Sequence, residues 1–280
     1  MDQTLMHNHP STKESLVTFF GLTFLLSVPF YVLNALAYLN VVFEPEMGAL
    51  YVVLFTVTPA ASASILTFRR SGRDGLKKLL RKIFDLGRIA KRRWYAPILL
   101  LMPLISLLSL GVVVLSGAPI RPALAPAVAL PAVFLLFFVM AAGEEVGWMG
   151  YAFAPMQAQG GALRASLVLG AIWAVWHLPF FVFMMPEPVI LLAQVLTLVG
   201  TRVLAAWIFN NTGKSVFAVI VFHAAENTVL VTLPELQAIS PWGPVVHCGF
   251  VLVAAAVVTF LWGPATLARF RLGESSQPAP

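Results

Sequence analysis

The stretch "ALPAVFLLFFVMAAGEEVGWMGYAF", residues 129–153, decides the fold. Its first half is a continuous apolar run of the kind that crosses a lipid bilayer as a helix. Two adjacent carboxylates, Glu144 and Glu145, follow in the same segment. Ionised side chains are costly inside a bilayer and usually mark function there. The stretch therefore predicts a membrane-spanning helix with a site inside it.

The composition of the whole chain agrees with a membrane protein. Of its 280 residues, 59% are hydrophobic and 11% are charged, and the mean hydropathy is +0.87. A soluble domain carries about 25% charged residues. We therefore expect an all-α, polytopic transmembrane helical bundle that forms a single integral membrane domain over residues 1–280. The first apolar run is too long for a signal-peptide core, so it should remain as a span.

About eight spans are expected, separated by connections rich in proline and glycine. They cover roughly 16–40, 48–68, 94–117, 128–151, 166–185, 188–209, 215–233 and 243–265.

Charge orients these spans. Segment 69–93 holds eleven Lys and Arg against two Asp, so it should stay cytoplasmic. Both termini are then inside, an N-in and C-in arrangement. The net charge of +6 reports on topology, and no nucleic-acid partner is expected. The expected location is the plasma membrane of a bacterium, with the lipid bilayer as the surrounding partner.

Few ionisable residues remain inside the spans. They are Glu144, Glu145, His177, Arg202, His223, Glu226 and His247. At about 1.5 Å of rise per residue, Glu144, His177 and His223 lie between the cytoplasmic third and the midplane. Asn227 follows His223 by four residues and shares its helix face. Three helices could thus form one polar chamber, open to the cytoplasmic side.

Such a set has the groups needed to hydrolyse a peptide bond within the membrane. A carboxylate can take a proton from water and return it to the leaving amine. Histidine and asparagine donors can stabilise an oxyanion. Alternatively, Glu144, His177 and His223 could ligate Zn2+ and leave one position open for water. The metal-assisted and glutamate-only mechanisms both remain open.

Three motifs in order carry a resemblance to a known family. "EEVGWMG" at 144–150 resembles the Glu-Glu-x-x-x-Arg motif of the CAAX protease and bacteriocin-processing (CPBP) family of intramembrane proteases, which includes the type II CAAX prenyl endopeptidases. "WAVWH" at 173–177 resembles its second motif, and "HAAEN" at 223–227 matches its third, His-x-x-x-Asn. The similarity covers about 128–232, the expected catalytic core.

The resemblance implies a hydrolase, an intramembrane endopeptidase with a peptide or protein substrate. Glu144 would be the general base that activates water, assisted by His177. His223 and Asn227 would form the oxyanion pocket, and Glu145 would be a supporting carboxylate. Family members are labelled metalloproteases, yet a metal-free glutamate mechanism is also argued for them.

One position departs from the family pattern. Met149 stands where the family has arginine, so an ion pair with Glu145, four residues earlier, is missing. Arg202 is the one arginine well inside an expected span, at about the depth of Glu145. We predict that Arg202 supplies the missing charge from another helix. The alternative is that its side chain snorkels to the interface.

Other functions and roles compete with this interpretation. Loss of the family arginine would also fit a catalytically silent immunity or scaffold protein. Buried Glu and His also build proton-coupled transporters, although no paired broken helices are visible here. His247 is expected at the interface. Four tryptophans are expected to serve packing, namely Trp148, Trp173, Trp176 and Trp207. Neither the substrate's identity nor the oligomeric state is indicated.

Overall fold

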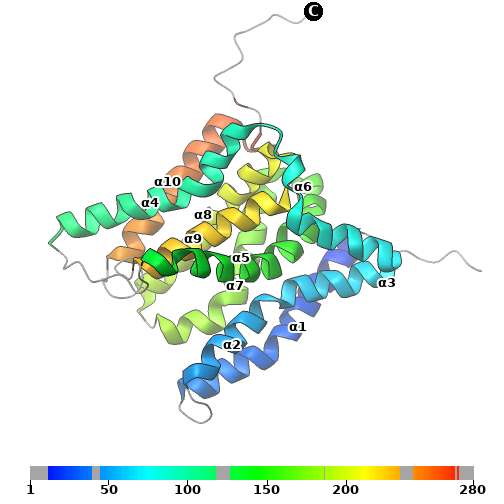
Figure 1. Cartoon of the computed structure of the whole chain (residues 1–280), viewed down its shortest axis with the longest axis horizontal. Helices are drawn as coiled ribbons and strands as arrows, with labels where there is room; N and C mark the ends of the chain where they lie inside the picture. Colours follow the sequence, from blue (N-terminus) through cyan, green and yellow to red (C-terminus); the bar gives the residue numbers. More distant parts are fainter. Residues whose placement is uncertain are drawn as a thin grey trace, which may run out of the picture.

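The structure is a computed structural model that describes residues 12–39, 45–117, 127–185, 187–233, 242–268 and 270. Within these ranges the regular structure is helical and no strand occurs, which confirms the all-α prediction. Seven helices are long and apolar enough to cross a membrane, and Val216–Thr232 is a shorter apolar helix. Together they correspond to the eight expected spans, and Figure 1 shows them packed as one bundle.

The helices follow one another along the chain with short connections. Their bounds are α1 (Thr12–Tyr38), α2 (Pro45–Thr56), α3 (Thr58–Leu80), α4 (Tyr95–Leu115), α5 (Leu130–Gly147), α6 (Ala154–Gly160), α7 (Ala162–Met184), α8 (Pro188–Asn211), α9 (Val216–Thr232) and α10 (Gly243–Trp262). A π-helical segment, η5 (Trp148–Phe153), joins α5 to α6. Short 3-10 turns are η1 (Arg81–Phe84), η2 (Leu86–Arg88), η3 (Arg92–Trp94) and η4 (Ala127–Ala129).

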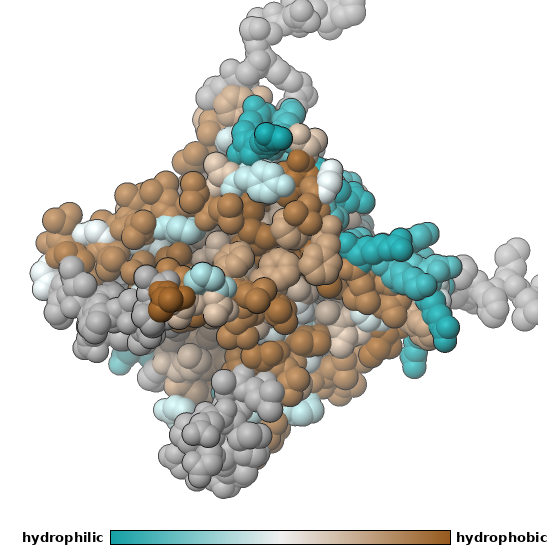
Figure 2. All heavy atoms as spheres, in the orientation of Figure 1, coloured by the Kyte–Doolittle hydropathy of each residue, from teal (hydrophilic) through white to brown (hydrophobic). Residues whose placement is uncertain are grey.

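Helix α8 lies inside the bundle, while the outer helices face the surroundings. In an apolar 18-residue stretch of α8, 61% is buried inside the protein, against 22% in the corresponding stretch of α1. α8 packs against α7 and α10, and α9 packs against α5 and α4. Figure 2 shows hydrophobic side chains over much of the visible surface. Such a surface suits contact with lipid, because apolar side chains that face lipid avoid the unfavourable contact with water.

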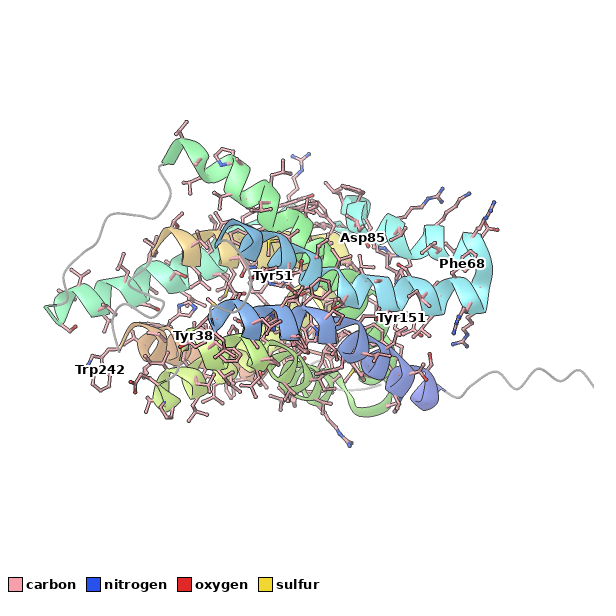
Figure 3. All side chains as sticks on the ribbon, turned by 90° about the horizontal axis from the view of Figure 1, so that it is seen from below. Tyr38, Tyr51, Phe68, Asp85, Tyr151 and Trp242 are labelled. Atoms are coloured by element: carbon pink, nitrogen blue, oxygen red, sulfur yellow. The ribbon has the colours of Figure 1, made fainter. Side chains whose placement is uncertain are left out.

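Hydrophilic side chains gather at one end of the bundle. Residue Gly72 has a φ of 61°, which interrupts α3 and lets its basic second half fold back. Figure 2 shows this polar region over α3 and over the segment that leads into α4. In Figure 3, Phe68 marks this end, and Trp242 lies toward the opposite one. We refer to the end that carries segment 69–93 as the basic end.

Two glycines hold α5 close to the junction of α2 and α3. A Cβ atom at Gly143 would lie 2.7 Å from the carbonyl oxygen of Thr56, and one at Gly147 would lie 2.6 Å from Pro59. Glycines four residues apart let helix backbones approach closely inside a membrane. Glu144 lies between the two, on the same helix. The glycine contact therefore fixes the height of the carboxylates within the bundle.

Substitution at these glycines should destabilise the bundle selectively. We predict that Gly147→Ala lowers the free energy of unfolding by about 1–3 kcal/mol, because the added methyl group meets backbone. Gly150→Ala is the matched control, since its Cβ would meet its nearest neighbour at 3.5 Å. Thermal unfolding of the purified variants in detergent measures the difference. Equal melting temperatures for the two variants would contradict the close-packing argument.

The basic end is predicted to face the cytoplasm, because positively charged segments are retained inside. In a Cys248→Ala background, Arg73→Cys should resist a membrane-impermeant thiol reagent in intact cells and react after permeabilisation. Glu187→Cys, at the opposite end of the bundle, should react without permeabilisation. Both positions are exposed in the structure. The reverse labelling pattern would invert the proposed orientation.

Candidate active site

Glu144 presents one free carboxylate oxygen to a cavity. Its side chain is 3% exposed, and Oε2 accepts a hydrogen bond of 2.7 Å from Nε1 of Trp173 on α7. The other oxygen has no hydrogen-bond partner in the described part of the chain. Glu144 lines a cavity of about 370 Å³ among α2, α5, α7, α8, α9 and α10. This carboxylate is therefore positioned to take a proton from a water molecule in the cavity.

Glu145, the neighbouring carboxylate, is fully engaged by other side chains. Its Oε2 lies 2.7 Å from Nη1 of Arg202 on α8, and its Oε1 lies 3.0 Å from Nδ1 of His223 on α9. Glu145 is not among the residues that line the cavity. The two adjacent carboxylates thus face different surroundings. Only Glu144 is placed to meet a water molecule or a substrate there.

The ion pair between Arg202 and Glu145 confirms the predicted cross-helix pairing. Both side chains are 1% exposed, so Arg202 does not snorkel to an interface. Its Cζ atom also lies 4.1 Å from the ring centroid of Trp173, a cation–π contact. Gly170 on α7 permits this approach, because a Cβ there would lie 2.9 Å from the Cα of Val199.

His177 adds a hydrogen-bond acceptor beside Glu144. Its Nδ1 lies 2.9 Å from the carbonyl oxygen of Trp173. A carbonyl oxygen only accepts, so Nδ1 must carry the proton and Nε2 of a neutral ring is left as an acceptor. The ring also stacks on Phe181, with centroids 5.4 Å apart. His177 lines the same cavity as Glu144, where it could orient a water molecule.

His223 and Asn227 form another wall of the cavity, on α9. The ring of His223 lies edge-to-face with Trp173, with centroids 5.4 Å apart, while its Nδ1 is bound by Glu145. Asn227 makes no hydrogen bond within the described part of the chain, so its amide is available to a ligand. The structure therefore brings four of the five predicted residues, all but Glu145, together around one cavity. Their catalytic roles remain predictions.

The cavity extends away from the basic end. Its apolar wall comes from α2, α5 and α7, and it continues toward Pro244 at the start of α10. If the basic end is cytoplasmic, the cavity extends toward the opposite side of the membrane. With this direction of the cavity, the predicted N-in orientation and the predicted opening to the cytoplasmic side cannot both hold.

Zinc ligation by Glu144, His177 and His223 stays a prediction from the sequence. Among the residues that the structure describes, no group of three or more His, Cys, Asp or Glu side chains could hold a metal ion. Glu144, His177 and His223 do line one cavity. Nδ1 of each histidine is engaged by a carbonyl or carboxylate oxygen, so Nε2 is the ring nitrogen that a metal would use. No step below is assigned to a metal.

Met149 lies in the π-helical segment, just after the α-helical segment that carries Glu145. The expected span 128–151 ends too early, because η5 and α6 continue the helical run to Gly160. Met149 is 1% exposed and belongs to the apolar core. The arginine at 202 meets Glu145 instead.

Sequence analysis missed the role of Trp173 and the placement of two other residues. Trp173 was expected to pack, yet it donates to Glu144 and lies under Arg202. Its four-residue spacing from His177 was the available signal. His247 was expected at the interface, but it is 3% exposed and lines the cavity. Glu226 also lines it and accepts a 3.0 Å hydrogen bond from Thr201.

Comparisons with known proteins indicate what the chain is similar to. Residues 126–229 match the family model described as type II CAAX prenyl endopeptidase Rce1-like. The chain is also similar to CAAX prenyl protease 2 of Methanococcus maripaludis, with 25% identity over 241 residues, or 80% of this chain and 86% of that protein. The resemblance found in the three motifs is thereby confirmed. The matched region, 126–229, contains all five predicted site residues.

Removing Arg202 should destabilise the protein. We predict that Arg202→Met lowers the free energy of unfolding by about 3–5 kcal/mol, because it leaves the buried Glu145 carboxylate without its cation. Arg164→Met is the matched control, since Arg164 is exposed on α7. Thermal unfolding in one detergent compares the two. An Arg202→Met protein as stable as the control would contradict a structural role for the pair.

Proposed function

With an Rce1-like domain at residues 126–229 as the premise, we propose that this integral membrane protein is an endopeptidase in which Glu144 activates the attacking water. The observation that carries the proposal is the contrast between the two carboxylates. Glu144 keeps one oxygen free in the cavity, whereas both oxygens of Glu145 are held.

The first step is attack of water on the substrate carbonyl. A water molecule in the cavity would donate one hydrogen bond to the free oxygen of Glu144 and one to Nε2 of His177. Its lone pair then faces the scissile carbonyl carbon. Glu144 takes the proton as the C–O bond forms, and the carbonyl oxygen becomes an oxyanion. The Trp173 N–H holds the other carboxylate oxygen and fixes the direction of the free one.

Asn227 and His223 would stabilise the oxyanion. The Asn227 side-chain amide supplies N–H donors directly. His223 can donate from Nε2 only when both ring nitrogens carry protons, because Nδ1 already donates to Glu145. The Glu145 carboxylate favours that charged ring, since it lies 3.0 Å away. Glu145 is therefore a positioning residue that acts through His223.

Collapse of the intermediate completes the hydrolysis. The C–N bond breaks, and Glu144 returns its proton to the departing amine, so the carboxylate is regenerated. The products are a new carboxyl terminus and a new amino terminus. CAAX prenyl protease 2 and the family description point to peptides that end in a prenylated CAAX sequence as the first substrate class to test.

Glu144 should be indispensable for cleavage. We predict that Glu144→Gln lowers kcat by about 10²–10⁴-fold, the usual contribution of a general base, while the protein stays folded. Glu226→Gln is the matched control, because it removes another buried carboxylate from the same cavity. The assay uses purified protein in lipid nanodiscs with a farnesylated CAAX reporter peptide. A whole-proteome peptide mixture, followed by mass spectrometry, extends it to other sequences.

The results of this assay distinguish Glu144 from Glu226 as the general base, and an active enzyme from a catalytically silent protein. Full cleavage by Glu144→Gln would refute the general-base role, and loss only in Glu226→Gln would move that role to Glu226. A wild-type protein that cleaves neither the reporter nor the peptide mixture would favour the catalytically silent alternative.

Activity should not depend on zinc. We predict that cleavage continues after dialysis against a chelator and that elemental analysis finds far less than one zinc per active chain. The physical reason is that the described His, Cys, Asp and Glu side chains form no group of three that could hold a metal ion. The His177→Ala variant provides the comparison. Stoichiometric zinc that is lost together with activity in this variant would restore the metal mechanism.

A further inference from the structure

A second cavity lies at the basic end, apart from the candidate active site. It has a volume of about 600 Å³ and lies where the segment before α4 meets the ends of α8 and α10. Its described lining consists of cationic, aromatic and small residues and includes no Asp or Glu. None of its lining residues belongs to the active-site cavity.

The charges in this cavity favour an anion. Arg88, Lys91 and Arg93 line it, and all three are exposed. Asp85 lies 3.4 Å from Nε of Arg88 and offsets part of that charge. Nη1 of Arg88 donates to the carbonyl oxygen of Gly213, so the guanidinium is held in place. Two further cations remain without a carboxylate among the described lining residues.

A buried hydrogen-bond donor adds an independent sign of a ligand. Trp207 lines the cavity and is 7% exposed. Its Nε1 is buried and has no hydrogen-bond partner in the described part of the chain. A buried N–H without a partner is costly, so such a group often has a ligand or a water molecule to bind. Trp207 borders the cavity, so an anion oxygen that displaces the atoms covering this N–H would satisfy it.

The aromatic residues indicate that this anion sits at a membrane interface. The Trp207 ring contacts Trp94 and Trp262, with centroids 4.9 and 5.1 Å apart, and Trp262 contacts Phe270 at 5.0 Å. Tryptophan gathers at the headgroup level of membranes, because the ring is apolar and its N–H is polar. A set of tryptophans combined with basic residues is suited to a lipid headgroup.

Two helices lead from this cavity into the bilayer region with apolar side chains exposed. Leu100 and Leu104 on α4 are 61% and 54% exposed, and Val257 and Phe260 on α10 are 48% and 69% exposed. The two helices pack against each other, as Figure 1 also shows. A free phosphate ion would have no use for this apolar surface. Acyl chains would cover it.

We propose that this cavity binds one anionic phospholipid, with the phosphate held by Trp207 Nε1, Lys91 and Arg93 and the acyl chains lying on α4 and α10. The proposal does not depend on the peptidase activity. It assigns a function to the aromatic cluster that neither packing nor charge topology alone explains.

Native mass spectrometry of the purified protein can test this site with defined lipids. The probes are phosphatidylglycerol and phosphatidylcholine with identical acyl chains, titrated one at a time. Trp207→Phe removes the N–H donor and keeps an aromatic ring, and Lys91→Gln combined with Arg93→Gln removes two cations. Arg69→Gln combined with Arg70→Gln is the matched control, since both residues are exposed on the same basic segment but outside the cavity.

We expect the first phosphatidylglycerol to bind at least about tenfold more tightly than phosphatidylcholine. The Lys91 and Arg93 double variant should weaken its binding about 30-fold, because each interfacial cation contributes about a factor of five. The Trp207→Phe variant should weaken it about tenfold. The control double variant should change it by less than about threefold.

Three results would overturn the proposal. The first is equal affinity for the two lipids. The second is equal loss in the two double variants, which would show non-specific attraction to the basic end. The third is displacement of the lipid by inorganic phosphate, which would show a site for small anions. If Trp207→Phe does not fold, the double variants decide the question, because their side chains are exposed.

Discussion

The buried ion pair between Glu145 and Arg202 is the interaction on which the rest of the site depends. Neither charge could remain in this interior alone, since an unpaired buried ion is costly to desolvate. Because the partners come from α5 and α8, and His223 from α9 joins them, one carboxylate ties together three helices. The same pair keeps Glu145 out of the cavity, so that Glu144 is the one of the two adjacent carboxylates that faces it. Two neighbouring residues of identical chemistry thereby acquire different surroundings.

The positions of the spans and of this pair could be predicted from sequence, because the bilayer imposes few solutions. A segment in hydrocarbon must be apolar and helical, and an arginine deep in a span needs a carboxylate or a route to the interface. The spacing of Trp173 from His177 could place both on one helix face. The hydrogen bond from Trp173 to Glu144 could not be predicted, because it depends on how α5 and α7 pack. The π-helical turn at Trp148–Phe153 and the direction of the cavity also depend on packing between helices distant in sequence.

Glycine residues let the helices approach closely enough for the Glu145–Arg202 ion pair to form. Lipid offers little hydrophobic force between helices, so association relies on close contact. Gly143 and Gly147 set α5 against the α2–α3 junction, and Gly170 lets α8 approach α7 at Arg202. With larger side chains at these positions, the 2.7 Å ion pair and the cation–π contact would be displaced. The polar geometry of the site is thus a consequence of small residues outside it.

Helix α8 connects the two cavities. Arg202 and Trp207 are five residues apart on it, or about 8 Å along the axis, and one belongs to the active-site network while the other lines the basic cavity. Both are held from several sides. Arg202 contacts Glu145 and Trp173, and Trp207 contacts two other tryptophans. Any shift of α8 along its axis would break both sets of contacts at once. Arg202 is therefore placed by a helix that is anchored at both levels. This explains how Met149 can occupy position 149 without leaving Glu145 unpaired.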